Sequence, residues 1–272
     1  MAPLFVKVSE ISPVATAFYR IALALPVLWL WHRHSDQITS GTPHPRKHRL
    51  MLLAGVFFAC DLSVWHWSIK MTSVANATLL ANFSPVFVTL GGWLLFRERV
   101  SGWFVFAVAL GIFGAAIVMG DSLQLKGSYL TGDLLSLLAA VFYGAYLLTV
   151  SRLRQYASTP EIMTWSGLSC AAVLFVIAVT TEEDLIPLTA QAWAILAGLA
   201  LISHAGGQSL ITFALAHLGA AFSSLGLLLQ PVVAALLAWG WLNESLRPWQ
   251  LAGGLLVLVA IGIARYDQTR RP

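Results

Sequence analysis

Asp61 is the residue whose type and position point most directly to chemistry. It lies near the middle of the apolar run 50–69, and a carboxylate at the centre of a bilayer costs about 3 kcal/mol on insertion scales. Such a side chain is expected to face a bundle interior or a wet cavity. Its carboxylate could couple transport to the movement of protons, or it could bind the amine of a solute. The alternative is a structural ion pair or hydrogen bond between helices.

Arg20 is the natural electrostatic partner of Asp61. It lies about two helical turns after Pro13, inside the apolar run 13–31. The alternative is that its long side chain snorkels to the outer membrane interface.

Trp65 and His66 follow Asp61 on the same run. Asp61, Trp65 and Ser68 are spaced i, i+4, i+7 and therefore share one helix face, with His66 one step away. A cavity lined by an acid, an indole and an imidazole suits a cationic or zwitterionic, partly aromatic solute. Trp65 could instead belong to an interfacial aromatic belt. His66 could titrate near neutral pH or form a buried hydrogen bond.

Pro85 and Pro231 lie near the middle of two other apolar runs. Each proline removes a backbone donor, which is predicted to free the carbonyl four residues earlier, that of Ala81 or Leu227. Freed carbonyls at membrane depth need a partner or a wet cavity. The pair is predicted to act as hinges or to form part of a site, with a simple kink as the alternative. Two amides beside the prolines, Asn82 and Gln230, could serve a solute or a helix.

The second half offers fewer polar candidates. Gln208 lies at the position that corresponds to Asp61, and His204 precedes it by one helical turn. The adjacent Gly206-Gly207 pair could instead serve close helix approach. Tyr143 and Tyr146 are further candidates for the cavity wall.

The composition indicates that the solvent for most of this chain is lipid. Of its 272 residues, 58% are hydrophobic and 10% are charged, against roughly 25% charged residues in soluble domains. The net charge is +4, and most of the basic residues lie in short loops between the apolar runs. This placement is expected where basic residues orient a membrane protein, so we predict no nucleic-acid partner. Cys60 and Cys170 suggest no disulfide framework and no metal site. Motifs for catalysis or nucleotide binding are missing, so we expect no enzyme, no catalytic residue and no cofactor.

Nine apolar runs are long enough to cross a bilayer as helices. Most of the arginines between the runs fall on one side if the loop 32–49 is cytoplasmic, which predicts a cytoplasmic C-terminus. Residues 1–8 are only a stub of a further helix, which is expected to be truncated, either by a start downstream of the true one or by loss of the helix. The runs are 13–31, 50–69, 73–96, 102–119, 130–150, 161–180, 192–215, 219–242 and 248–264.

The two halves repeat one another at a constant offset of 146 positions. Residues 73–118 match 219–264 without gaps, and the matches include a proline, two tryptophans and a glutamate in each half. Five spans separate each matched pair, so the two copies must run in opposite directions. Inverted repeats of this kind are typical of secondary transporters. The matched pairs are Pro85/Pro231, Trp93/Trp239, Glu98/Glu244 and Trp103/Trp249.

The sequence resembles the drug/metabolite transporter superfamily, with two EamA-type repeats over nearly the whole chain. Four segments carry the resemblance: Thr72–Pro85, Phe96–Glu98, Leu242–Glu244 and Gly132–Ala140. The resemblance implies an all-α membrane protein with an inverted five-plus-five helix repeat around a central cavity. The repeats would span 1–120, with the truncated first helix, and 128–267.

The function predicted from these features is a secondary transporter. It would export or exchange small polar metabolites, such as amino acids, across the cell inner membrane by alternating access. Its partners would be a small-molecule solute and the lipid bilayer, with a homodimer left open. The alternative is a membrane scaffold or receptor that does not transport.

Overall fold

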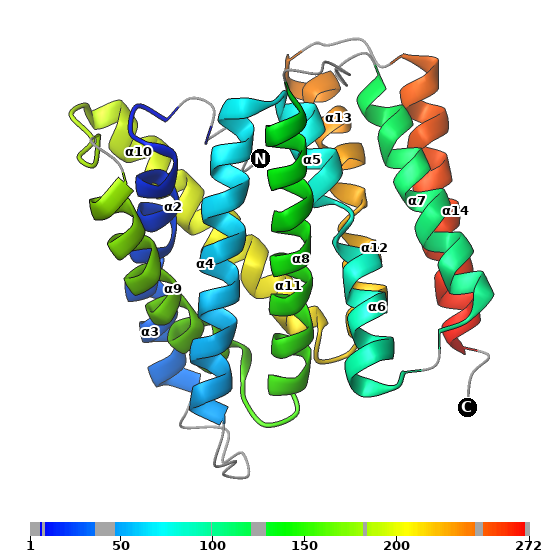
Figure 1. Ribbon diagram of the computed structural model, residues 1–272, viewed down its shortest axis with the longest axis horizontal. Helices are drawn as coiled ribbons and strands as arrows, with labels where there is room; N and C mark the ends of the chain where they lie inside the picture. Colours follow the sequence, from blue (N-terminus) through cyan, green and yellow to red (C-terminus); the bar gives the residue numbers. More distant parts are fainter. Residues whose placement is uncertain are drawn as a thin grey trace.

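The computed structural model describes residues 6, 9–35, 47–98, 100–120, 129–181, 184–242 and 247–269, which form helices joined by short connections and contain no strand. Figure 1 shows the helices side by side in a bundle. In chain order they are α2 (Pro13–Ala22), α3 (Leu25–Ser35), α4 (Lys47–Met71), α5 (Val74–Ala81), α6 (Ser84–Phe96), α7 (Gly102–Met119), α8 (Leu130–Leu153), α9 (Thr159–Thr181), α10 (Ala190–Gly198), the π-helix η3 (Leu199–Gln208), α11 (Ser209–Ala214), α12 (Ala220–Gly226), α13 (Leu229–Leu242) and α14 (Pro248–Thr269).

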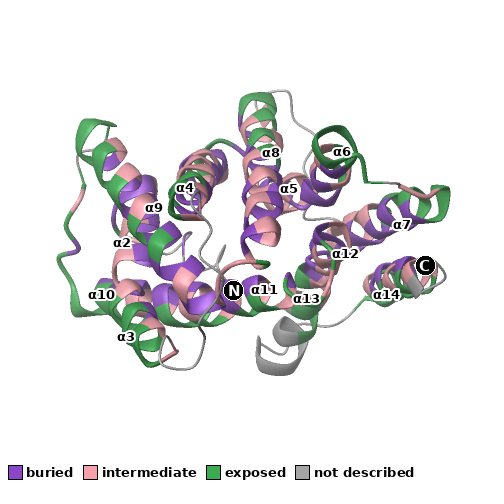
Figure 2. Ribbon diagram, turned by 90° about the horizontal axis from the view of Figure 1, so that it is seen from below, coloured by how far each residue is buried: buried purple, intermediate pink, exposed green. Residues whose placement is uncertain are grey.

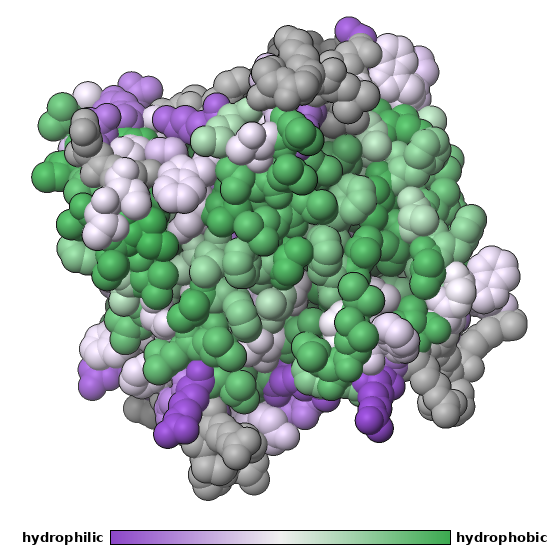
Figure 3. Space-filling view, in the orientation of Figure 1, coloured by the Kyte–Doolittle hydropathy of each residue, from purple (hydrophilic) through white to green (hydrophobic). Residues whose placement is uncertain are grey.

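The helices have the dimensions of membrane spans. Eight of the described helical stretches, each of 18 to 25 residues, are long and apolar enough to cross a bilayer, and Ala220–Val233 forms a shorter apolar helix. Figure 3 shows an apolar surface in the middle of the molecule and hydrophilic groups at both ends. The predicted multi-pass helical membrane protein is therefore confirmed. Apart from Val6, the predicted stub at residues 1–8 lies outside the described residues, and so does Glu244.

Three of the predicted spans are interrupted, each shortly before a proline. Proline clashes with the preceding turn of a helix and disfavours helical backbone in the residue before it. The sequence predicted kinks or hinges at Pro85 and Pro231, whereas the structure has full breaks between two helices there. The break before Pro26 was not predicted. The turn residues are Leu23–Ala24 between α2 and α3, Asn82–Phe83 between α5 and α6, and Leu227–Leu228 between α12 and α13.

The break before Pro231 satisfies its own backbone. The N–H of Gln230 donates to the carbonyl of Leu227 at 2.9 Å. The prediction that Pro231 leaves this carbonyl free is therefore wrong, because the chain tightens into a three-residue turn that supplies another donor. The expectation that Pro85 leaves the carbonyl of Ala81 free stays a prediction.

Helices that match in sequence run in opposite directions. In Figure 1, α7 rises where α14 descends, and α5–α6 descends where α12–α13 rises. An inverted repeat requires this relation. The full five-plus-five arrangement and its central cavity stay predictions. α4 packs along both α8 and α9, and α7 packs along its mate α14. Figure 2 shows α2, α3 and α9 toward one end of the molecule and α7 and α14 at the other.

The contact between α7 and α14 depends on two facing glycines. A Cβ atom on Gly253 would lie 2.6 Å from the carbonyl oxygen of Gly114 and 2.8 Å from the backbone nitrogen of Val118. Backbone atoms cannot move aside as a side-chain tip can. Small residues at such crossings let membrane helices approach closely, so these glycines set the separation of the two helices.

We expect Gly253→Ala to lower the free energy of unfolding by about 1–3 kcal/mol, because the added methyl group forces the helices apart. Gly262→Ala is the matched control, since Gly262 lies on the same helix and no atom approaches its Cβ position within 4 Å. Thermal unfolding of both variants in detergent measures the difference. Equal melting temperatures would show that the glycine contact does not set the packing.

Candidate functional site

Two of the polar candidates from the second half lie on the π-helix η3. Its wider turns are rare and often occur at functional sites. It carries His204 and Gln208, both buried. A Cβ on Gly206 or Gly207 would meet, within 4 Å, only a carbonyl oxygen of the same helix, at 3.4 Å and 3.6 Å. The described residues therefore do not support the alternative that this pair serves close approach to another helix.

A stack of aromatic rings joins η3 to α4 and α8. The ring of Phe58 lies 4.7 Å from that of Tyr146, 5.7 Å from His204 and 6.3 Å from Tyr143, measured between centroids. Tyr143 and Tyr146 also stack on one another at 5.9 Å. Phe58 was not among the residues predicted from the sequence. Helical periodicity could have found it, because it precedes Asp61 by three residues on the same face.

Hydrogen bonds connect the tyrosines to η3, α9 and α11. Tyr143 donates from its hydroxyl to Oε1 of Gln208 at 3.4 Å. Tyr146 and Thr212 both direct their hydroxyls at the sulfur of Met163, at 4.0 Å and 3.3 Å. Met163 and Thr212 were also missed. They come from other helices, and no spacing in the sequence relates them to the tyrosines.

Arg20 and Asp61 bring opposite charges into the protein interior. Their side chains are 7% and 8% exposed, and each charge attracts the other. The two are nevertheless not among the ion pairs within 4.0 Å recorded for the described residues. Arg20 is buried, so it does not snorkel to the interface. α2, which carries Arg20, packs against α4, which carries Asp61 and His66, and against η3, which carries His204.

His66 and Trp65 occupy the next turn of α4. Nδ1 of His66 donates to the carbonyl of Pro13 at 2.8 Å, and its ring packs edge-on against Trp65 at 5.3 Å. Trp65 is 9% exposed and packs with Val6, Ala139 and Leu199. It is therefore an interior residue and does not belong to a lipid-facing belt.

The remaining candidates are not joined to this stack by any recorded contact of the described residues. Asn82 is buried in the turn between α5 and α6, and Pro85 and Pro231 are buried beside the two breaks. Gln230 is exposed. Asn82 and Gln230 lie beside the prolines in the sequence, but no contact among the described residues places either amide near Asp61.

Several buried polar atoms of the site have no hydrogen-bond partner in the described part of the protein. A buried donor or acceptor without a partner costs about 1–3 kcal/mol, and native proteins normally satisfy such groups with protein, water or ligand. These atoms belong to the groups already described around Arg20 and to the amide of Gln208. They are Arg20 Nε, Trp65 Nε1, His66 Nε2, both ring nitrogens of His204 and Gln208 Nε2.

Named relatives of the chain are transporters. It is 27% identical over 263 residues to the pseudopaline exporter CntI of Pseudomonas aeruginosa, which covers 96% of this chain and 89% of that protein. It is 26% identical to a probable terminal-alkyne amino-acid exporter of Streptantibioticus cattleyicolor, over 81% of this chain and 75% of the relative. These names support the expectation that the chain is not an enzyme.

The comparisons show the fold and the family of the chain separately. A solved crystal structure that shares 16% sequence identity superposes with a TM-score of 0.79 over 99% of this chain and 96% of the other, which shows a common fold. The model of the EamA-like transporter family matches residues 2–120 and again residues 130–266. Nearly every residue is covered by these two matches, and the chain belongs to the EamA-like transporter family.

Proposed function

We propose that this membrane transporter exports or exchanges small zwitterionic metabolites of the amino-acid class by secondary transport. The observation that carries the proposal is the buried pair of opposite charges, Arg20 and Asp61, which attract one another without forming an ion pair within 4.0 Å. An α-amino acid carries a carboxylate and an ammonium group and could satisfy both. The name of the Streptantibioticus cattleyicolor relative, an amino-acid exporter, supports the same solute class.

Each group of the site has a proposed role. Arg20 would bind the carboxylate through charge-assisted hydrogen bonds, and Asp61 would bind the ammonium. The aromatic stack on Phe58 would contact the apolar part of the solute, while Gln208 and His204 offer unpartnered polar atoms. Protonation of Asp61 would abolish its attraction for the ammonium. Exchange of a proton for the solute would follow from that competition.

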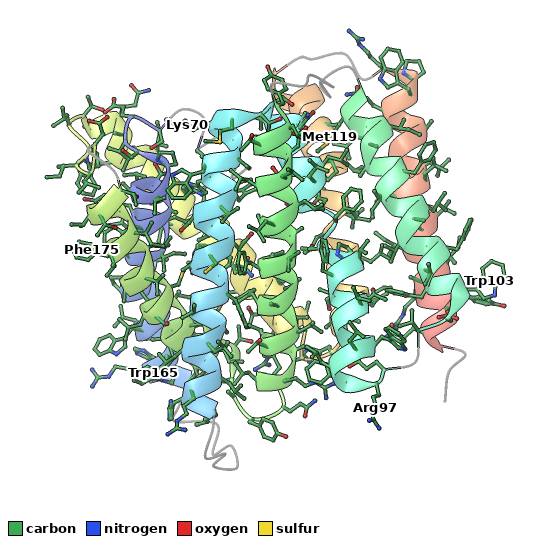
Figure 4. The ribbon with its side chains drawn as sticks, in the orientation of Figure 1. Lys70, Arg97, Trp103, Met119, Trp165 and Phe175 are labelled. Atoms are coloured by element: carbon green, nitrogen blue, oxygen red, sulfur yellow. The ribbon has the colours of Figure 1, made fainter. Side chains whose placement is uncertain are left out.

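Alternating access is supported by the difference between the two ends of the bundle. At the end that holds Arg97 (Figure 4), a polar crevice of about 470 Å³ lies between residues of both halves, including Glu98, Arg152 and Asp267. At the opposite end, Thr72 donates to the carboxylate of Asp133 at 2.6 Å and Asn76 donates to it at 3.2 Å. We infer a state that is closed at the Asp133 end and accessible from the Arg97 end.

The helix breaks are the proposed hinges. Those beside Pro85 and Pro231 interrupt the two matching spans at nearly equivalent positions. Short turns of this kind can absorb changes in backbone angles while the flanking helices stay rigid. Rocking of one half against the other would close the crevice and separate the groups around Asp133.

The distribution of basic residues supports the proposed orientation in the cell inner membrane, with the C-terminus in the cytoplasm. Arg97 and the C-terminus lie at the same end of the bundle, and Lys70 lies at the other (Figures 1 and 4). Arg152 and Arg154 lie at the C-terminal end of α8, which is at the same end of the bundle as Arg97. Cytoplasmic ends of membrane helices are enriched in such residues.

Uptake into proteoliposomes tests the proposal. We expect the wild type to transport radiolabelled amino acids or related amines, with a response to a pH gradient. Asp61→Asn and Arg20→Gln are each expected to reduce uptake by about 10- to 100-fold, because each removes a charged hydrogen-bond partner of about 1.5–3 kcal/mol. The response to the pH gradient should also disappear in Asp61→Asn.

Asp184→Asn is the control, because Asp184 is an exposed acid outside the membrane spans. It should transport like the wild type. Full uptake by Asp61→Asn and Arg20→Gln would contradict the assigned site. A folded protein that moves none of these solutes would favour the alternative of a scaffold or receptor.

The contacts of Asp133 predict a shift in conformation. Asp133→Ala removes them and is expected to raise the population open at that end by about 10-fold. The measurement is the labelling rate of Ser68→Cys by a membrane-impermeant maleimide, in a chain with Cys60 and Cys170 replaced, because Ser68 is fully buried in α4 near that end. The exposed Lys70→Gln provides the control. Equal labelling in both variants would show that Asp133 does not hold this end closed.

A further inference from the structure

A large apolar groove separates α6 from α7, although the two helices are consecutive in the chain. α6 packs against α8 and α12, and α7 packs along α14, so the pair diverges (Figure 1). The groove has a volume of about 1310 Å³ and is lined mainly by aliphatic and aromatic side chains, among them Leu90, Ile112 and Phe113. This volume exceeds the roughly 300–1,000 Å³ of typical small-molecule sites, so the groove has room for a larger apolar occupant.

One end of the groove carries a positive charge. Arg97 lines the groove, is exposed, and has no ion-pair or side-chain hydrogen-bond partner among the described residues. Its neighbour Glu98 also lines the groove but is bound to Arg152 at 3.0 Å. The acidic charge is thus compensated, and the guanidinium of Arg97 is left to attract an anion.

Exposed tryptophans mark the depth of this end. Trp93 lines the groove one turn before Arg97 and is 56% exposed, and Trp103, at the start of α7, is 66% exposed (Figure 4). Tryptophan is enriched at the level of the lipid headgroups. The apolar walls therefore lie at the depth of the acyl chains, and Arg97 lies at the depth of the headgroup phosphates.

The backbone of Arg97 adopts a conformation that normally favours glycine. Its φ angle is +55°, and the turn is closed by hydrogen bonds from Arg97 N–H to Trp93 at 3.0 Å and from Glu98 N–H to Gly92 at 3.1 Å. Glycine is the usual residue at such a helix end. A side chain in this position strains the backbone, and an interaction of the Arg97 guanidinium would offset that cost.

We propose that the groove binds one anionic phospholipid, with its acyl chains between α6 and α7 and its headgroup phosphate on Arg97. Basic pockets between membrane helices bind acidic lipid headgroups in this way. A soluble phosphate would leave the apolar walls uncovered.

Thermal unfolding of the purified full chain in detergent tests the proposal. Phosphatidylglycerol is expected to raise the melting temperature by about 5 °C more than the same concentration of phosphatidylcholine. Arg97→Gln should abolish this difference. Arg33→Gln should retain it, because Arg33 is also exposed at the same end of the bundle but lies over Trp29, outside the groove.

The Arg97→Gly variant distinguishes a loss of lipid binding from a loss of protein stability. Glycine adopts the positive φ angle without a steric penalty, so this variant should unfold no more easily than the wild type without lipid and should still lose the preference for phosphatidylglycerol. Equal shifts with both lipids in the wild type, or equal losses in Arg97→Gln and Arg33→Gln, would overturn the proposal. So would a full shift with inorganic phosphate alone, or efficient cross-linking of Phe113→Cys between two copies in vesicles.

Discussion

The buried charges of Arg20 and Asp61 constrain the structure around them. A charge taken out of water loses several kcal/mol of hydration, which an opposite charge repays only with good geometry and further hydrogen bonds. The two side chains attract one another without pairing within 4.0 Å. Polar atoms of His66 on α4 and of His204 and Gln208 on η3 lie buried without a hydrogen-bond partner in the described part of the protein. The proposed solute would supply partners for such groups.

The irregular segments of the backbone follow from the same solvent. A regular helix satisfies its own N–H and C=O groups in lipid, so a departure is tolerated only where protein or water replaces the lost bonds. The breaks before Pro85 and Pro231 and the π-helix η3 are such departures. Two of them hold buried amides with unpartnered nitrogens, Asn82 and Gln208. Irregular backbone and unsatisfied polar groups thus coincide inside the bundle.

Packing divides the bundle unevenly. α4 lies against α8 and α9, and α7 lies against α14 through the glycine pair Gly114 and Gly253. α6 packs mainly against α8 and α12, although α7 is the next helix in the chain. The polar crevice and the apolar groove adjoin one another, since Thr89, Glu98 and Val100 line both.

The sequence alone determined the class of protein, the spans and the inward face of α4, because hydropathy and helical periodicity are local properties. It placed Asp61, Trp65 and His66 together on one helix but left open whether Trp65 lay at the membrane interface, and the structure buries all three. Tertiary structure decided which helices meet. Phe58, Met163 and Thr212 join the site, and Gln230 is exposed. Membrane helices draw on a restricted apolar alphabet, so their sequences carry little information about packing partners. The separation of Arg20 from Asp61 and the π-helix likewise depend on how several helices pack together, which no single segment encodes.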